Sequence, residues 1–232
     1  MSLEIYLDGA DLQLITHWAK HPAVSGFTTN PSLLKAAGVT DYAAFGKLAT
    51  AAALGKPISF EVVTDDITDM ERQARIISAW GPNVYVKVPI TNAVGNSTLR
   101  LVTRLAEDGI PVNVTAVFTV EQIYDTMKAL IHAKAAIVSV FAGRIADTGR
   151  DPEAFVRDAS VLRQNPQIKV LWASTREIFN TLQAVRADAD IITMTPALFD
   201  KLVQSWGKAL DLYSLETVTQ FLVDAQRSGL TL

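Results

Sequence analysis

The feature of this sequence that most constrains its fold is a regular alternation of short apolar segments with longer segments of helical period. The short segments are rich in β-branched residues, and most of them are apolar at consecutive positions. Such continuous runs are typical of parallel strands covered on both faces, and their alternation with helices is typical of β-α units. We expect eight strands, at about residues 3–8, 26–29, 57–63, 84–88, 111–115, 136–141, 169–173 and 190–194.

Helical segments separate the expected strands and predict a closed barrel. They lie at about 12–20, 42–54, 67–80, 97–107, 120–133, 152–164 and 177–187, and an eighth follows at 196–202. Three begin with helix start signals, which are Asp65-Asp66, Thr119 with Gln122 three residues later, and Asp151-Pro152. We predict an α/β fold, a single (β/α)8 TIM barrel domain over residues 1–232, because no linker, repeat or low-complexity tract divides the chain.

A further helix is expected near the C-terminus, within residues 215–232, and the barrel does not need it. Its apolar residues fall at helical spacing on one face, and they are Leu215, Val218, Phe221, Leu222 and Ala225. A surplus helix with an apolar face suggests packing on another subunit, so we expect a homo-oligomer.

Composition and charge exclude several classes of protein. Hydrophobic residues make up 49% of the chain and charged residues 19%, which suits an ordinary buried core. The chain has no cysteine, so disulfides, thiolate nucleophiles and cysteine metal sites are excluded. A net charge of −3 does not favour nucleic-acid binding, and no apolar run is long enough to span a membrane. We expect a soluble cytoplasmic protein with no nucleic-acid or membrane partner.

Polar residues stand at the C-terminal ends of most expected strands, which is where β/α barrels carry their active sites. Buried polar groups are costly unless they meet one another or a ligand, so we expect these residues to converge. In strand order the set is Asp8; Thr28, Thr29 and Asn30; Glu61; Lys87; Asn113 and Thr115; Ser139 and Arg144; and Ser174 and Arg176.

Lys87 is the most informative of these residues, because it stands inside the apolar strand Tyr85-Val86-Lys87-Val88-Pro89. Burial disfavours the ammonium form of a lysine, and the free amine can attack a carbonyl carbon to form a Schiff base. A structural lysine that pairs with Glu61 or Asp8, or that reaches water, is the alternative. The carboxylates expected on the neighbouring strand and on the first strand favour the Schiff-base interpretation.

Arg144 and Arg176 follow the sixth and seventh strands, close to where many barrels bind phosphate. We expect Arg176 at the start of a helix, whose backbone N–H groups would also favour an anion. The pair therefore predicts an anion clamp, and two unrelated surface arginines are the alternative.

Two apparent metal motifs are rejected. Asp65-Asp66-Ile67-Thr68-Asp69 has a magnesium-binding spacing, but these carboxylates open a helix, where they complement its dipole. His17 and His21 lie four residues apart on an expected outer helix, far from the strand ends. No nucleotide-binding glycine motif is present, so nucleotide binding has no support in the sequence.

Five ordered motifs resemble those of the transaldolase family, and most closely those of its short subfamily, which also contains fructose-6-phosphate aldolases. The resemblance covers nearly the whole chain. The motifs are Gly26-Phe27-Thr28-Thr29-Asn30-Pro31-Ser32, Val86-Lys87-Val88-Pro89, Asn113-Val114-Thr115, Ser139-Val140-Phe141-Ala142-Gly143-Arg144-Ile145-Ala146-Asp147 and Ala173-Ser174-Thr175-Arg176.

The resemblance implies a class I aldolase-type barrel that acts on sugar phosphates through a lysine Schiff base, without metal or cofactor. It implies that Lys87 forms the Schiff base, that Asp8 is the acid/base, and that Glu61 works through a water held also by Thr115. The implied substrate-binding residues are Asn30, Asn113 and Ser139 for the dihydroxyacetone unit and Ser174, Arg144 and Arg176 for the phosphate, with Thr29 and Phe141 as further substrate-binding residues. It also implies a pentamer or decamer, and a role in the pentose phosphate pathway.

Two positions discriminate transaldolase from fructose-6-phosphate aldolase. The aldolase branch typically has glutamine and tyrosine where this chain has Glu61 and Phe141, so we favour transaldolase and keep the aldolase as the alternative. Trp172 stands where the family often has a small residue, and Thr195-Pro196 matches more loosely. The exact sugars therefore stay open, including a ketose with a terminal sulfonate, and a catalytically silent sugar-phosphate binder is a third hypothesis.

Overall fold

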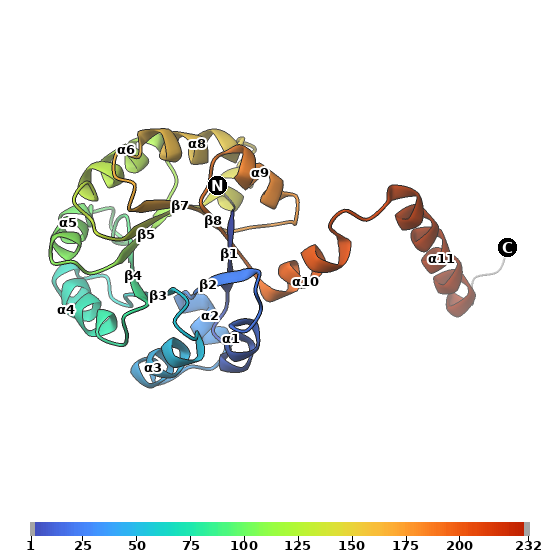
Figure 1. Cartoon of the computed structure of the whole chain (residues 1–232), viewed down its shortest axis with the longest axis horizontal. Coiled ribbons are helices and arrows are strands. Elements are labelled where there is room, and N and C mark those ends of the chain that lie inside the picture. The colour runs from blue at the N-terminus through green and yellow to red at the C-terminus, as the bar shows by residue number, and fades with distance from the viewer. Residues whose placement is uncertain (1–2, 230–232) are drawn as a thin grey trace.

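The computed structural model describes residues 3–229 and shows a closed barrel of eight parallel strands in sequence order. Each strand pairs with its two sequence neighbours, and β1 closes the ring against β8 (Figure 1). The predicted α/β fold is confirmed. The strands are β1 (Glu4–Asp8), β2 (Val24–Thr28), β3 (Ile58–Glu61), β4 (Val84–Pro89), β5 (Val112–Val117), β6 (Ala136–Val140), β7 (Ile168–Trp172) and β8 (Ile191–Met194).

Helices surround the barrel on its outer side (Figure 1). The predicted start signals act as helix caps: Asp66 accepts a hydrogen bond from the Asp69 N–H, and Thr119 and Gln122 form a capping box. The barrel helices are α1 (Leu12–Trp18), α2 (Pro31–Ala36), α3 (Tyr42–Ala52), α4 (Ile67–Ser78), α5 (Leu99–Glu107), α6 (Val120–Ala129), α7 (Ala142–Ala146), α8 (Pro152–Leu162), α9 (Asn180–Arg186) and α10 (Pro196–Ser205). Within residues 3–229 no helix is long and apolar enough to cross a bilayer.

Two short helices, α2 and α7, were not predicted, because five or six residues are too few for a periodic pattern. α2 begins three positions after the end of β2, and α7 begins two positions after the end of β6. Asn30 caps α2 by accepting a hydrogen bond from the Leu33 N–H at 3.0 Å. α7 lies so close to the end of β7 that a Cβ atom on Gly143 would be 1.6 Å from the Ser174 carbonyl oxygen. Glycine is therefore required at position 143.

Alternate residues of each strand point into the barrel or out towards the helices, and this produces two apolar clusters. The larger one lies between the strands and the helices and includes the fully buried Trp172. The smaller one is formed by Tyr6, Ile137, Leu171, Ala173 and Ile191, with Tyr85 and Phe141 packed against it. It takes one or two residues from each contributing strand, as expected for the layered interior of a β/α barrel.

Strand register brings the predicted polar residues to one level. Asp8 is paired with Thr28, Glu61 with Lys87, Lys87 with Asn113, and Pro89 with Thr115. Because all the strands are parallel, these pairs lie at the same end of the barrel.

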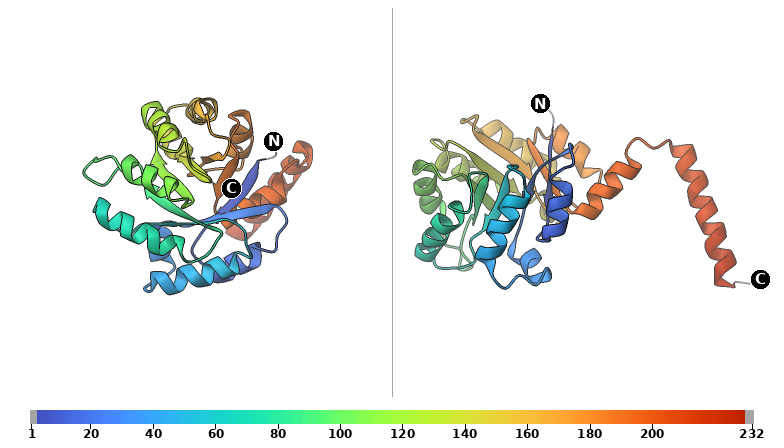
Figure 2. Two further views of the ribbon diagram at one scale, coloured as in Figure 1. Left: turned by 60° about the vertical axis from the view of Figure 1, so that its left-hand side comes forward. Right: turned by 60° about the horizontal axis from the view of Figure 1, so that its bottom comes forward.

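The predicted C-terminal helix is present as α11 (Leu210–Ser228), which begins five residues earlier than the predicted residue 215. It extends away from the barrel (Figures 1 and 2), and none of its residues is buried. Its expected apolar face is exposed, with Leu215 63%, Val218 61% and Phe221 68% accessible. Residues 230–232 of the predicted C-terminal segment lie outside the described part of the chain.

Candidate active site

A cavity of about 470 Å³ opens at the C-terminal ends of the strands, between parts of the chain that are distant in sequence. The predicted site residues line it, except Thr29 and Asn113. Those on its wall are Asp8, Asn30, Glu61, Lys87, Thr115, Ser139, Phe141, Arg144, Ser174 and Arg176.

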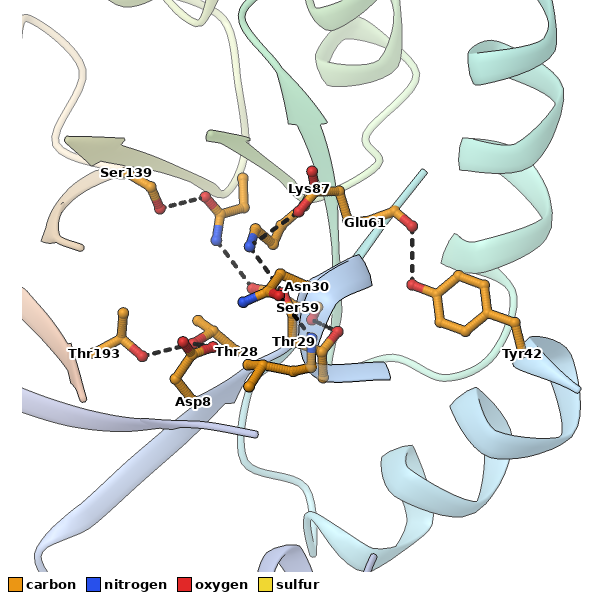
Figure 3. A network of polar contacts seen from close by, with 12 residues as sticks. Asp8, Thr28, Thr29, Asn30, Tyr42, Ser59, Glu61, Lys87, Ser139 and Thr193 are labelled. Atoms are coloured by element: carbon orange, nitrogen blue, oxygen red, sulfur yellow. Dashed lines mark hydrogen bonds and ion pairs between the residues drawn. The ribbon is translucent and has the colours of Figure 1, made fainter. Parts of the chain in front are cut away.

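Lys87 lies at the meeting point of three strands, and only 6% of the residue is exposed. Its Nζ donates a hydrogen bond to the Thr29 carbonyl oxygen at 2.8 Å and lies 3.3 Å from Oε2 of Glu61 on the neighbouring strand (Figure 3). The ion pair that the structural interpretation requires is therefore present. The same amino group also borders the cavity, where a bound molecule can reach it.

Glu61 is held through its backbone as well as its side chain. Tyr42, on α3, donates its hydroxyl to the Glu61 carbonyl oxygen at 2.9 Å (Figure 3). Burial raises the pKa of Tyr42, so its phenol stays protonated and remains a donor across the physiological range. Thr115 lines the same cavity, and its buried Oγ1 has no hydrogen-bond partner within the described chain. That hydroxyl therefore has unused hydrogen-bonding capacity beside the cavity.

The carboxyl group of Asp8 lies under opposing influences. Burial raises its pKa, nearby Lys87 and a hydrogen bond from Thr28 lower it, and Glu61 raises it. The Thr28 hydroxyl donates to Oδ1 of Asp8 at 3.0 Å. A carboxyl group with opposed influences of this kind is suited to exchange a proton with a bound molecule.

Thr29 and Asn113 lie behind the cavity wall. Both are fully buried, and their side chains are committed to protein partners. The Thr29 hydroxyl donates to the Ser59 carbonyl oxygen at 2.9 Å. Asn113 donates to the Ser59 hydroxyl at 3.1 Å and accepts from Ser139 at 2.7 Å. The Thr29 carbonyl group and the Asn113 side chain thus contact Lys87 and Ser139, and neither residue is among those that line the cavity.

The two arginines lie on the same cavity, and both are exposed. The Arg144 guanidinium lies 5.4 Å from the ring centroid of Phe141, in cation–π contact. Arg176 forms an ion pair with Asp147. Arg144 has no ion pair within residues 3–229, so its charge remains available to an anion.

One expectation about Arg176 is wrong. It does not open a helix with free N–H groups, because α9 begins only at Asn180. The Asn180 side chain instead accepts hydrogen bonds from the backbone N–H groups of Arg176 and Glu177, at 2.8 and 3.1 Å. These donors are satisfied inside a turn, so any anion binding here depends on the side chains.

Sequence reasoning missed several residues that complete this site. Ser59 lies two positions before Glu61, and Thr193 two positions after the inward-facing Ile191, so the two-residue period of the strands could have identified both. Thr193 lines the cavity and contacts Thr28. Tyr42 comes from an outer helix, and no strand pattern indicates it.

Comparison with known proteins shows what this chain is similar to. A family model described as Transaldolase/Fructose-6-phosphate aldolase matches residues 5–231. A probable transaldolase of Roseiflexus castenholzii is 37% identical over 227 residues, which is 96% of each chain. A probable transaldolase of Dehalococcoides mccartyi is 34% identical over 204 residues, which is 87% of this chain and 91% of the relative.

Solved structures at much lower identity share the fold. A structure described as native KDPGal has a TM-score of 0.58 at 12% identity, and the match covers 91% of this chain and 89% of the other. A crystal structure of KGPDC from Streptococcus mutans has a TM-score of 0.57, also at 12% identity, over 89% of this chain and all of the other. These likenesses support the barrel architecture alone.

The arginine pair generates a prediction about anion binding. Arg144→Gln and Arg176→Gln should each weaken the binding of inorganic phosphate by about tenfold or more, because a hydrogen bond to a charged group contributes about 1.5–3 kcal/mol. Isothermal titration calorimetry measures the change. Arg157→Gln is the matched control, since that exposed arginine lies on α8 and donates to the Arg186 carbonyl oxygen. Unchanged phosphate affinity in both cavity variants would contradict the clamp.

Proposed function

The chain belongs to the transaldolase/fructose-6-phosphate aldolase family, and we propose that it is a transaldolase. It transfers a dihydroxyacetone unit from a ketose phosphate of the fructose 6-phosphate type to an aldose phosphate acceptor. The observation that carries this proposal is the placement of the Lys87 amino group on the cavity beside Glu61, with Asp8 on the same wall. A buried amine with carboxylates in reach suits Schiff-base chemistry.

The proposed reaction begins when the Lys87 ammonium gives a proton to the neighbouring Glu61 carboxylate and Nζ, now a free amine, attacks the C2 carbonyl of the ketose. Glu61 then returns the proton to the carbinolamine hydroxyl, which leaves as water and gives a protonated imine. Glu61 and the free Thr115 hydroxyl hold the water that leaves here and returns at hydrolysis. Both groups line the cavity, and the Thr115 hydroxyl has unused hydrogen-bonding capacity, which supports this role.

Cleavage of the carbon–carbon bond follows from the protonated imine. The Asp8 carboxylate takes the proton of the C4 hydroxyl, the C3–C4 bond breaks, and its electron pair moves into the imine to give a neutral enamine. The aldose phosphate leaves, and an acceptor aldehyde takes its place and is attacked by the enamine in the reverse sequence. The imine is the electron sink, so this chemistry calls for no metal or cofactor.

Substrate binding is divided between two parts of the cavity wall. We assign the hydroxyls of the dihydroxyacetone unit to Asn30 and Ser139, with Thr29 and Asn113 supporting the wall from behind. We assign the terminal phosphate to Arg144, Arg176 and Ser174, which line the cavity after β6 and β7. A sulfonate could occupy the same place, because the arginines recognise an anion of this shape.

Glu61 and Phe141 favour the transferase over the alternative, a fructose-6-phosphate aldolase that releases free dihydroxyacetone and glyceraldehyde 3-phosphate. A carboxylate can exchange a proton with the held water, whereas an amide can only orient it. Phe141 offers no hydrogen bond, and it packs against Phe118 with ring centroids 5.5 Å apart. The relatives at 32–37% identity are named as probable transaldolases, which supports the same choice.

The proposed function is tested directly by its need for an acceptor and by its covalent intermediate. Fructose 6-phosphate should be consumed quickly only when erythrose 4-phosphate is present. Borohydride reduction with the donor should add mass to the peptide that contains Lys87. Lys169→Met is the control that keeps labelling, since Lys169 pairs with Glu4 at the other end of the barrel, and Lys87→Met should abolish it. Labelling of another lysine rejects the assigned role of Lys87, and labelling of none rejects the Schiff-base mechanism and leaves a silent sugar-phosphate binder.

The balance between transfer and release should depend on Glu61 and Phe141 together. We expect Glu61→Gln combined with Phe141→Tyr to lower transfer to erythrose 4-phosphate and to raise the formation of free dihydroxyacetone. The reason is that the variant changes both the group that holds the water and the hydrogen bonding near the imine. The readout is the ratio of the two initial rates in wild type and variant. An unchanged ratio, or a wild type that already releases faster than it transfers, points to the aldolase.

We also propose that the protein is a cyclic homo-oligomer, a pentamer or decamer, in which α11 packs on a neighbouring copy. The support is that α11 extends from the barrel with its apolar face uncovered (Figure 2). Burial of such a face contributes about 25 cal/mol per Å² of apolar surface. The cytoplasmic location and the absence of nucleic-acid or membrane partners stay predictions.

Changing the apolar face of α11 should alter the mass in solution. We expect Val218→Glu combined with Leu222→Glu to dissociate the oligomer, because charges would be placed in a buried apolar contact. Light scattering measures the mass, and Thr217→Glu, which lies outside the apolar face of the same helix, is the control that keeps it. If the unmodified protein is already a monomer, the oligomer proposal is wrong.

A further inference from the structure

We propose that Thr193, on β8, is a positioning residue for Asp8 and acts on it through the hydroxyl of Thr28. Thr193 Oγ1 lies 2.5 Å from Thr28 Oγ1, and Thr28 donates to Oδ1 of Asp8 at 3.0 Å (Figure 3). The two threonines and the carboxyl group come from three adjacent strands, β8, β2 and β1. The inference rests on the proposed function and adds to it a residue that sets the proton affinity of the acid/base.

The direction of this chain follows from proton counting. A threonine hydroxyl has one proton to donate and two lone pairs that accept. Thr28 gives its proton to the Asp8 carboxylate, so it can only accept in its contact with Thr193. Thr193 is therefore the donor, and the chain runs from Thr193 to Thr28 to Asp8. Donation by Thr193 polarises the Thr28 hydroxyl and keeps its proton pointed at the carboxylate.

The two threonine hydroxyls of this hydrogen-bond chain are shielded from solvent. Thr28 is 3% exposed and Thr193 is 7% exposed, so water has little access to compete for their hydroxyls. The backbone of Thr193 is fixed as well, because the Thr175 hydroxyl donates to its carbonyl oxygen at 2.7 Å. The register pairs Tyr6 with Thr193 and Asp8 with Thr28, so Thr193 lies one layer below Asp8 and contacts the Thr28 hydroxyl from that side.

The groups around Asp8 determine in which direction its pKa should move when the hydrogen bond is lost. Burial raises the pKa of Asp8, Lys87 on β4 and the Thr28 hydrogen bond lower it, and Glu61 on β3 raises it. The proposed reaction starts from ionised Asp8, so its pKa appears as the acid limb of kcat/KM against pH. Loss of the hydrogen bond removes a stabiliser of the carboxylate, and the acid limb must then move to higher pH.

The experiment compares Thr193→Val, Thr28→Val, the double variant and Thr193→Ser, since valine keeps the shape of threonine without the hydroxyl. The readouts are kcat/KM for transfer against pH and a ¹³C NMR titration of the Asp8 carboxyl in the free protein. We expect a rise of about one pH unit for Thr28→Val, the scale of one hydrogen bond to a charged group. The rise for Thr193→Val should be smaller, at about half a unit.

Thr193→Ser should retain the wild-type profile, because serine keeps the donor. The double variant should match Thr28→Val alone, because Thr193 has no route to Asp8 once Thr28 cannot relay its effect. The control is Thr126→Val, which removes a buried hydroxyl on α6 that donates to the Gln122 carbonyl oxygen. It should change stability without moving the acid limb.

Two results would overturn the inference: an Asp8 titration that Thr193→Val leaves unmoved, or a shift of equal size in the Thr28→Val background. The NMR titration does not depend on turnover. If the wild type fails to transfer dihydroxyacetone while Thr193→Val still raises the pKa of Asp8, the proposed function fails and the hydrogen-bond chain stands.

Discussion

Closure of the parallel sheet is the constraint on which the rest of this structure depends. A closed ring of strands has no free edge, and every second residue must point into a narrow interior. Apolar side chains such as Tyr6, Ile137 and Leu171 fill the lower part of that interior. At the C-terminal ends the inward positions are polar, and burial obliges each group to find a partner or to face the cavity. The ion pair of Lys87 with Glu61 follows from this obligation.

Much of the fold and of the cavity wall could be predicted from the sequence, because both depend on short-range periods. The apolar runs indicate the strands, and polar residues at their ends indicate the wall. Contacts between distant segments could not be read in this way. Thr29 and Asn113 are set behind the wall by contacts with Ser59, and Asn180 takes up the N–H groups expected to face an anion at Arg176.

Two residues with strained backbone conformations lie near the C-terminal ends of β5 and β7, beside the cavity. Ala116 and Ser174 both have positive φ, at 57° and 64°, and both line the cavity. Such conformations are costly for residues with a side chain, so the surrounding packing must enforce them. Ser174 is held by α7, which packs closely against its carbonyl oxygen because Gly143 has no side chain. The same close contact sets the place of Arg144, so the proposed anion-binding part of the wall depends on a residue without a side chain.

The charge changes of the proposed cleavage step fit an Asp8 carboxyl group that is both buried and hydrogen-bonded. In the proposed cleavage step a positive imine on Lys87 and a negative Asp8 become a neutral enamine and a neutral carboxylic acid together. Burial favours the neutral pair, since it raises the pKa of Asp8. Taken alone, that burial favours the protonated acid. Lys87 and the Thr28 hydroxyl oppose it by stabilising the carboxylate, which is the form that the proposed acid/base role requires.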